Sequence, residues 1–227
     1  AASEATIDKA LGCLDIALKQ KLPCVHLVES AGVDLPNYSV KLWSKFGSVF
    51  YKKAKLSAAG IPVIAILHGF STAGGAYQIG MSDYVIGVKG NGMAALAGSA
   101  LLKAATGENA TNSDIGGVEM HSVVTGSVEY LVNDDAESIA TVRKLIDQLN
   151  WNDNDTQKTI LNFEEPEYPI DDLAGIVPTD YSKAYDVREV IARLVDQSGF
   201  KELKPKYGLS MVCAQAKIEG IQCGIIA

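Results

Sequence analysis

The segment VIAILHGFSTAGGAYQIGMSD, residues 63–83, decides the fold of this 227-residue chain. The apolar run IPVIAIL at 61–67 is too short to span a bilayer and is typical of a buried strand. A glycine-rich turn follows it, and we expect a helix to begin near Gly75. The segment therefore predicts a strand–turn–helix unit in which the free N–H groups of the helix lie at the carboxyl end of a buried strand.

Similar elements flank this unit on both sides. LPCVHLVE at 22–29 and YVIGV at 84–88 are further apolar runs of strand length. The spacing of apolar residues predicts helices over 3–20, where Ser3 offers an N-cap, and over 39–59. The alternation of helix and strand predicts an α/β fold with a largely parallel sheet.

The second half of the chain is predicted to be helical first and then extended. Further helices are expected over 97–107, 134–149 and 184–197. Residues 164–182 are rich in Pro, Asp and Tyr, which indicates an ordered excursion or a linker. Residues 210–227 predict two strands around a Glu219-Gly220 turn. Because such a hairpin looks like the opening of a second unit, we expect a chain trimmed at both ends.

Composition narrows the class of protein. The formal net charge is −7 and no basic stripe is present, which argues against nucleic acid as a partner. No apolar run is long enough for a membrane span and no signal peptide opens the sequence, so we expect a cytoplasmic protein with no membrane partner. The four cysteines form no CxxC pair. They are predicted to be reduced core residues, and no metal site is expected.

Two glycine-containing turns follow two of the predicted strands. SAGVD at 30–34 follows the first, and TAGGA at 72–76 follows the second. In a parallel sheet both turns lie at the edge where α/β proteins bind ligands. One peptide N–H from each turn could hold a single oxygen atom as an oxyanion hole. The glycines could equally serve close strand–helix packing, and spacing alone favours that second interpretation.

Five blocks in order carry a resemblance to a known family. They are HGFSTAGGAYQIGMSD (68–83), LLKAATGE (101–108), DIGGVEMHSVVTG (114–126), YDVREVIARLVD (185–196) and KIEGIQCGIIA (217–227). In these blocks the chain resembles the carboxyltransferase (beta) subunits of biotin-dependent acyl-CoA carboxylases, members of the crotonase superfamily. The turn LVESAGVDLP (27–36) is nearest to the enzymes for methylcrotonyl, geranyl or long-chain acyl groups, which suggests a branched or longer acyl group.

The resemblance implies a crotonase-like fold of repeated ββα units, with the start of a second crotonase-like domain at the C-terminus. The implied domains are an N-terminal carboxyltransferase domain at 1–163 that lacks its first strands, a linker and helix at 164–205, and an opening hairpin at 206–227. In the family the active site lies between the N-terminal domain of one subunit and the C-terminal domain of another. We therefore expect these residues alone to bind acyl-CoA weakly and not to carboxylate it.

The resemblance also implies the chemistry. A proton leaves the α-carbon of a coenzyme A thioester, and the enolate takes the carboxyl group released by carboxybiotin on a carrier protein. The implied catalytic groups are the backbone amides of Val33 and Gly74, and the base is the biotin ureido anion. The implied substrate-binding residues are Ala31, Gly32, Gly75, Ala76 and Tyr77. The implied partners are acyl-CoA, the biotin carboxylase and biotin carrier component, and further copies of the chain in a homo-oligomer.

Two alternatives stay open. A crotonase-fold hydratase or hydrolase would need a side-chain acid or nucleophile at 72–77, and Ala73 and Tyr77 argue against it. A non-catalytic paralogue that acts in assembly is the second alternative. Of the remaining polar residues, His121 is expected to be a buried, hydrogen-bonded histidine, and Lys52, Lys53 and Lys103 are expected to be solvated surface lysines.

Overall fold

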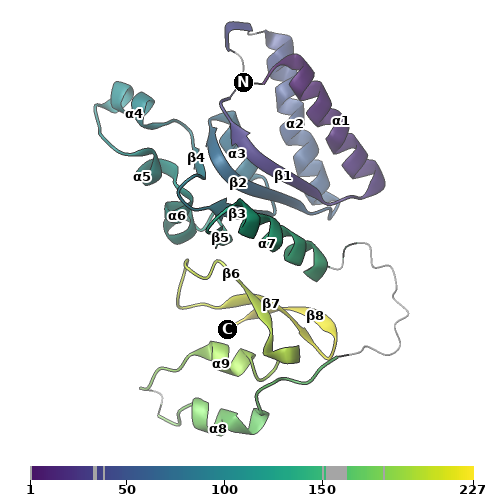
Figure 1. Ribbon diagram of the computed structural model, residues 1–227, viewed down its shortest axis with the longest axis vertical. Helices are drawn as coiled ribbons and strands as arrows, with labels where there is room; N and C mark the ends of the chain where they lie inside the picture. Colours follow the sequence, from purple (N-terminus) through teal and green to yellow (C-terminus); the bar gives the residue numbers. More distant parts are fainter. Residues whose placement is uncertain (1, 33–34, 38, 150, 152–162, 181) are drawn as a thin grey trace. The chain divides into compact units, whose positions relative to one another are not determined.

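The computed structural model describes residues 2–32, 35–37, 39–149, 151, 163–180 and 182–227 (Figure 1). These residues belong to two compact units, one within 1–151 and the other within 152–227. Every helix among them is too short or too polar to cross a membrane.

The first unit is built from helices and parallel strands in alternation. Its described helices are α1 (Glu4–Gln20), α2 (Val40–Ala58), α3 (Gly74–Gly80), α4 (Ser99–Thr106), α5 (Asn112–Gly116), α6 (Val118–Met120) and α7 (Asp135–Gln148), with the short turns η1 (Leu35–Asn37) and η2 (His121–Thr125). Its described strands are β1 (Cys24–Ser30), β2 (Val63–Thr72), β3 (Tyr84–Val88), β4 (Met93–Ala95) and β5 (Tyr130–Val132).

The strands form one sheet in the order β1-β2-β3-β5, and β4 pairs with the last residues of β2. All four pairings are parallel, which confirms the predicted parallel sheet. The predicted helices over 3–20, 39–59, 97–107 and 134–149 are confirmed within a few residues at each end. The sequence did not predict β4 and β5, which are each three residues long.

The core lies on both faces of β2. On one face Val63, Ala65 and Leu67 pack toward α1, α2 and α3. On the other face Ile64 and Ile66 pack against α7. All five side chains are fully buried, and each large aliphatic chain contributes roughly 1.5–3 kcal/mol of hydrophobic stabilisation. Since both faces are covered, β2 is an unbroken apolar run rather than an alternating one.

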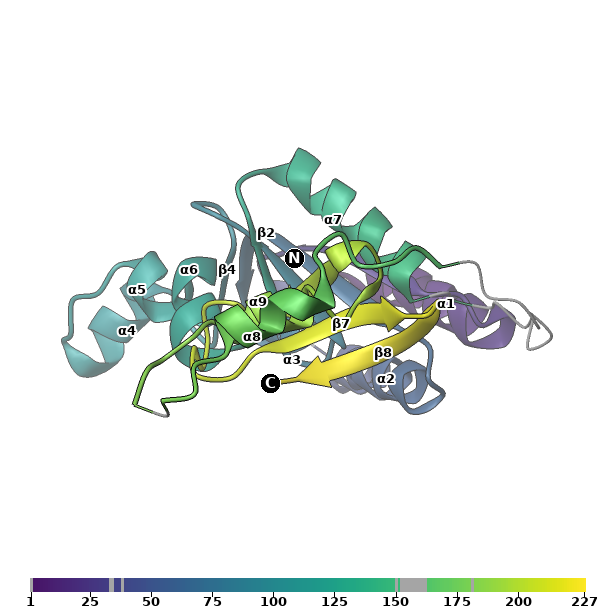
Figure 2. The same cartoon turned by 90° about the horizontal axis from the view of Figure 1, so that it is seen from below.

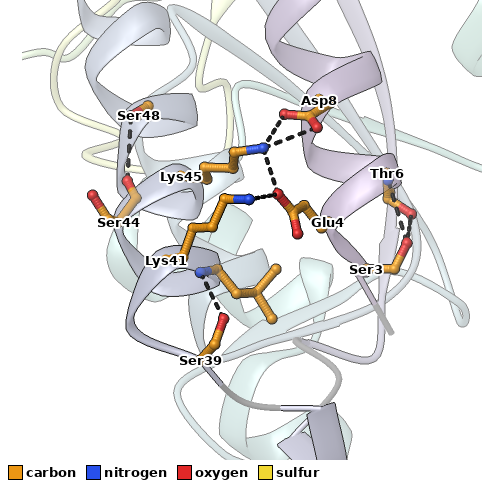
Figure 3. Close-up of polar contacts among 10 residues, drawn as sticks. Ser3, Glu4, Thr6, Asp8, Ser39, Lys41, Ser44, Lys45 and Ser48 are labelled. Carbon is orange, nitrogen blue, oxygen red and sulfur yellow. Dashed lines mark hydrogen bonds and ion pairs between the residues drawn. The ribbon is translucent and has the colours of Figure 1, made fainter.

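Side-chain caps and ion pairs fix the two N-terminal helices. Ser3 caps α1 as predicted, since its Oγ accepts the Thr6 N–H. Lys45 of α2 lies between two acids of α1, at 2.7 Å from Glu4 and 2.9 Å from Asp8 (Figure 3). Hydrogen bonds from Lys45, and then from Lys41, lower the pKa of Glu4 to about 2. These charged groups are largely exposed to solvent. The ion pairs therefore influence how α1 and α2 align more than they stabilise the two helices.

Lys53 is not the surface lysine that the sequence predicts. Its side chain is only 2% exposed, on the face of α2 that also buries Val49 and Leu56. Its Nζ donates to the Gln78 carbonyl oxygen at 2.8 Å. Loss of hydration lowers the pKa of Lys53 to about 8. The prediction was wrong because Lys53 occupies an inward position in the helical repeat, whereas the neighbouring Lys52 and Lys55 are more exposed.

We predict that Lys53→Met raises the stability of the protein at pH 7 by about 1–3 kcal/mol. The folded-state pKa lies below the unfolded value, so burial of the charge costs most below pH 8, and that cost disappears as the pH rises toward 10. The Gln78 carbonyl keeps a second donor, Ser82 Oγ at 2.7 Å. Urea unfolding at pH 7 and pH 10 checks this: the advantage of the variant must shrink at pH 10, and an equal or larger advantage there contradicts it.

The second unit is a small antiparallel sheet with short helices. Its described elements are η3 (Ile170–Asp172), α8 (Leu173–Ile176), α9 (Val187–Ile191), η4 (Asp196–Ser198), β6 (Phe200–Leu203), β7 (Cys213–Ile218) and β8 (Ile221–Ile226). The strands pair antiparallel in the order β6-β7-β8, and β7 and β8 run side by side (Figure 2). The predicted hairpin is confirmed, and its turn residues Glu219 and Gly220 both have positive φ, as a two-residue turn with this twist requires.

The helix predicted over 184–197 is wrong in extent, because α9 covers only five of those residues. Beyond it, Val195 is extended and completely buried in the core of the unit. The next residue, Asp196, accepts the backbone N–H groups of Glu219 and Gly220, each at 2.8 Å. A continuous helix could not place both residues in this way, so long-range contacts override an amphipathic pattern that is sound by itself.

Candidate functional site

The two glycine-containing turns lie next to each other at one edge of the sheet. β1 ends at Ser30 and β2 ends at Thr72, and the parallel pairing places Ser30 opposite Ser71. Ala31 and Gly32 therefore follow β1 beside the turn that begins α3. The Gly32 N–H donates to Ser30 Oγ at 3.1 Å, which shapes this first turn. Val33 lies outside the described residues, so the role of its amide stays a prediction.

Ala73 is the bend between β2 and α3, and its backbone is strained. It has φ 51° and ψ −122°, backbone angles that residues other than glycine rarely adopt. Its N–H donates to the Ala95 carbonyl oxygen at 3.0 Å, and its carbonyl accepts the Ala76 N–H at 3.0 Å. These bonds hold the bend, and its methyl group is exposed. In α/β hydrolases a bend of this kind presents the nucleophile.

Gly74 and Gly75 supply unbonded amides in a crowded place. Among the described residues, neither N–H donates a hydrogen bond, as expected at the first positions of a helix. A Cβ on Gly74 would lie 2.8 Å from Phe46 Cε1, and one on Gly75 would lie 2.6 Å from Ser71 Oγ. Both glycines are thus required for space, so close packing and free amides occur together at this turn.

Aromatic side chains of α2 line the approach to this turn. The rings of Phe46 and Phe50 meet edge to face at 5.0 Å, and Phe50 lies 5.7 Å from the Tyr77 ring of α3. Tyr77 is 59% exposed and Ala76 is partly buried. A side chain that borders the site must be exposed, and Tyr77 meets this requirement. The sequence analysis missed Phe46 and Phe50, although their i, i+4 spacing indicates one shared helix face.

Other motif residues have structural partners. His121 Nε2 lies 2.7 Å from the Ala94 carbonyl oxygen, which can only accept, so Nε2 carries the proton. His121 Nδ1 is 2.9 Å from Thr125 Oγ1. The predicted hydrogen bonding of His121 is confirmed, but its predicted burial is wrong, because the residue is only partly buried. Asp83, the last residue of the quoted segment, accepts the Val63 N–H at 2.8 Å and ties the starts of β2 and β3 together. Among the described residues, no cluster of His, Cys, Asp or Glu suits a metal ion.

The fold and this edge define a class of protein: an α/β domain in which two glycine-containing turns lie side by side at the ends of two neighbouring parallel strands. The chain matches the carboxyl transferase domain family over residues 1–227, and it belongs to that family. The solved relatives carry the crotonase-like α/β fold, which confirms the predicted fold class.

Two curated relatives are similar over nearly the whole chain. The beta chain of mitochondrial methylcrotonoyl-CoA carboxylase from Dictyostelium discoideum is 43% identical over 98% of this chain and 38% of its own length. A probable biotin-dependent acyl-coenzyme A carboxylase beta2 subunit from Mycobacterium tuberculosis is 42% identical over 98% of this chain and 41% of its own length. The chain thus spans about two fifths of the relatives that it matches.

Two solved structures are also similar. The beta subunit of geranyl-CoA carboxylase from P. aeruginosa is 41% identical, with a TM-score of 0.61 over 99% of this chain and 42% of that one. The transcarboxylase 12S hexamer, crystallised with hydrolysed methylmalonyl-coenzyme A, is 30% identical, with a TM-score of 0.88 over 100% of this chain and 44% of that one.

Packing at Gly75 predicts a position-specific loss of stability. Gly75→Ala is expected to destabilise the protein by about 1–3 kcal/mol, because its Cβ would overlap Ser71 Oγ. Gly80→Ala in the same helix is the matched control, since its Cβ would meet nothing within 4 Å. Adding Ser71→Ala should restore part of the loss, because it removes the hydroxyl that the new Cβ would overlap. This buried hydroxyl has no hydrogen-bond partner among the described residues, so its removal costs little. Urea unfolding measures all three, and equal effects at Gly75 and Gly80 would refute the argument.

Backbone strain at Ala73 predicts a substitution that stabilises the protein. Ala73→Gly should stabilise the protein by roughly 1 kcal/mol, because glycine adopts positive φ without a steric penalty. Ala76→Gly, three residues on in the helix, should destabilise it by roughly 0.5–1 kcal/mol. Thermal unfolding of the two variants checks the pair, and a loss of stability in both would show that Ala73 is unstrained.

Proposed function

We propose that the described edge of the sheet binds the thioester of an acyl-CoA for carboxyl transfer from carboxybiotin. The observation that carries this proposal is the Ser30–Ser71 pairing, which brings the turn after β1 beside the unbonded amides of Gly74 and Gly75. Membership of the carboxyl transferase domain family supports it. The names of the relatives, which are acyl-CoA carboxylase subunits, support the same substrate class.

In the proposed mechanism the amides of Val33 and Gly74 hold the thioester oxygen from two sides. Negative charge develops on this oxygen when the α-proton leaves, so donors that are fixed in place stabilise the enolate more than the ground state. Each donor in such a hole lowers the activation barrier by roughly 3–4 kcal/mol. Ala31, Gly32, Gly75, Ala76 and Tyr77 are the proposed walls around the thioester. When bound, carboxybiotin on a carrier protein would supply the carboxyl group as CO₂, and the biotin ureido anion that remains would take the α-proton.

The side chains at the turn support amide catalysis over a hydrolase or hydratase. Ala73 places a methyl group where a hydrolase presents its nucleophile. Ser71 is fully buried, and its hydroxyl makes no hydrogen bond to a described residue that could act as base. Tyr77 stands where a hydratase of this superfamily needs a carboxylate. The turn therefore offers no carboxylate, and neither Ala73 nor Ser71 is placed as a nucleophile.

The acyl group of the substrate and the partner proteins are further parts of this proposal. We propose a branched or longer acyl group, a biotin carboxylase and biotin carrier component, and association with further copies of the chain. The aromatic surface beside Gly74, formed by the half-buried Phe50 and the exposed Tyr77, suits an aliphatic group. The hexamer described for the transcarboxylase 12S relative supports self-association.

The proposal predicts recognition of the thioester oxygen itself. Octanoyl-CoA should bind this chain roughly tenfold more tightly than S-octyl-CoA, a thioether of the same length, because two hydrogen bonds to the carbonyl oxygen are lost. Isothermal titration of both ligands, at equal ionic strength, measures the ratio. Equal affinities for the two ligands would show that the amides do not hold the thioester oxygen. If a folded chain bound neither ligand, the assembly paralogue would replace the carboxyltransferase as the better proposal.

A further inference from the structure

Lys53 is a buried cation without a carboxylate in contact. Its Nζ donates to the Gln78 carbonyl oxygen at 2.8 Å and lies 3.5 Å from Ser82 Oγ. Both of these partners are uncharged. Across the described ranges, no Asp or Glu forms an ion pair with Lys53. Buried charges in proteins are usually paired, because a lone charge in a low-dielectric interior is costly.

A cavity of about 190 Å³ lies beside this cation. It is an open pocket lined by residues of α1, α2, β1 and α3, with Lys53, Gln78 and His26 as its polar residues, and with an aliphatic lining that includes Ala10, Leu14, Val25 and Val49. The volume suits a ligand of about benzene size. An apolar cavity with a few polar groups at one place is the usual form of a small-molecule site.

The other titratable groups around Lys53 carry no compensating charge into the cavity. Burial raises the pKa of the Cys24 thiol and lowers the pKa of His26 to about 4, so both are neutral at pH 7. Cys13 of α1 is a free thiol that also lines the cavity. Asp83 lies near enough to act on Lys53 through its charge, but its carboxylate bonds to the Val63 N–H and to Ser57.

Gln78 adds a second unmet requirement. Only 7% of this residue is exposed, and its Oε1 has no hydrogen-bond partner among the residues that the structure describes. An acceptor left without a donor in a buried position costs about 1–3 kcal/mol. This oxygen is closed off from solvent, so the cavity itself offers a cation that needs an anion, with an aliphatic lining between α1 and β1.

We propose that this cavity binds a short-chain carboxylate, with its carboxylate on the Lys53 ammonium and its aliphatic carbons against Leu14 and Val25. The site differs from the acyl-CoA edge, because it is built from Lys53 and the inward side of α3 rather than from the amides of the Ala73–Gly75 turn. Its occupation would pair the buried charge, and it would contact α3 at Gln78, four residues after Gly74.

The test is isothermal titration of 3-hydroxybutyrate into the 227-residue chain at pH 7 and constant ionic strength. Saturable one-to-one binding is expected. Lys53→Met should weaken it at least tenfold. Lys52→Met is the matched control, because it removes the same charge one residue away on the exposed side, where Lys52 pairs with Asp15. This control should bind as the unaltered chain does.

The unaltered chain gives an independent readout through pH. The affinity should fall about 100-fold between pH 7 and pH 10, because Lys53 loses its proton near pH 8. No saturable binding at pH 7, binding that is equal in Lys53→Met, or binding that is constant to pH 10 would each overturn the proposal. Loss of octanoyl-CoA binding with retained 3-hydroxybutyrate binding would count against the carboxyltransferase proposal alone.

Discussion

The parallel pairing of β1 with β2 is the constraint on which the candidate site depends. Val28 pairs with Leu67 and Ser30 pairs with Ser71, so β2 uses four residues where β1 uses two. This bulge includes Gly69, where a Cβ would lie 2.8 Å from the Glu29 side chain. Beyond the bulge β2 pairs with β4 instead of β3. The irregularity thus brings the two turns level and lets the Ala95 carbonyl, at the end of β4, hold the strained bend at Ala73.

At the turn that follows, close packing and the proposed function make the same requirement of the backbone. Phe46 lies against Gly74, and the hydroxyl of Ser71 lies against Gly75, so α3 begins with its backbone in contact with its neighbours. A helix held this firmly cannot turn its first N–H groups aside, and preorganised donors are what a developing oxyanion needs. The strain at Ala73 persists because the hydrogen bonds on both sides of it fix the backbone.

Charge is used differently on the two sides of α2. On the outer side, Lys41 and Lys45 pair with acids of α1 in water, where such pairs contribute little. On the inner side, Lys53 keeps an unpaired ammonium among apolar groups, where the same charge lowers stability at pH 7. A side chain with this cost and an adjoining cavity is better explained by a bound anion than by stability of the fold.

The sequence by itself determined the alternation of helices and strands, the parallel sheet, the hairpin at Glu219-Gly220 and the two turns that border the candidate site, because apolar periodicity and glycine placement are local signals. Only the tertiary structure decided the three-residue strands β4 and β5, the early end of α9 and the burial of Lys53. These features depend on partners distant in sequence. The strand β4 pairs with the part of β2 beyond the bulge, and Val195 is extended because this conformation places its side chain in the core. The fold class could therefore be predicted from the chain, whereas the strain at Ala73 and the cation beside the cavity required the packed structure, since both arise from contacts that no local pattern specifies.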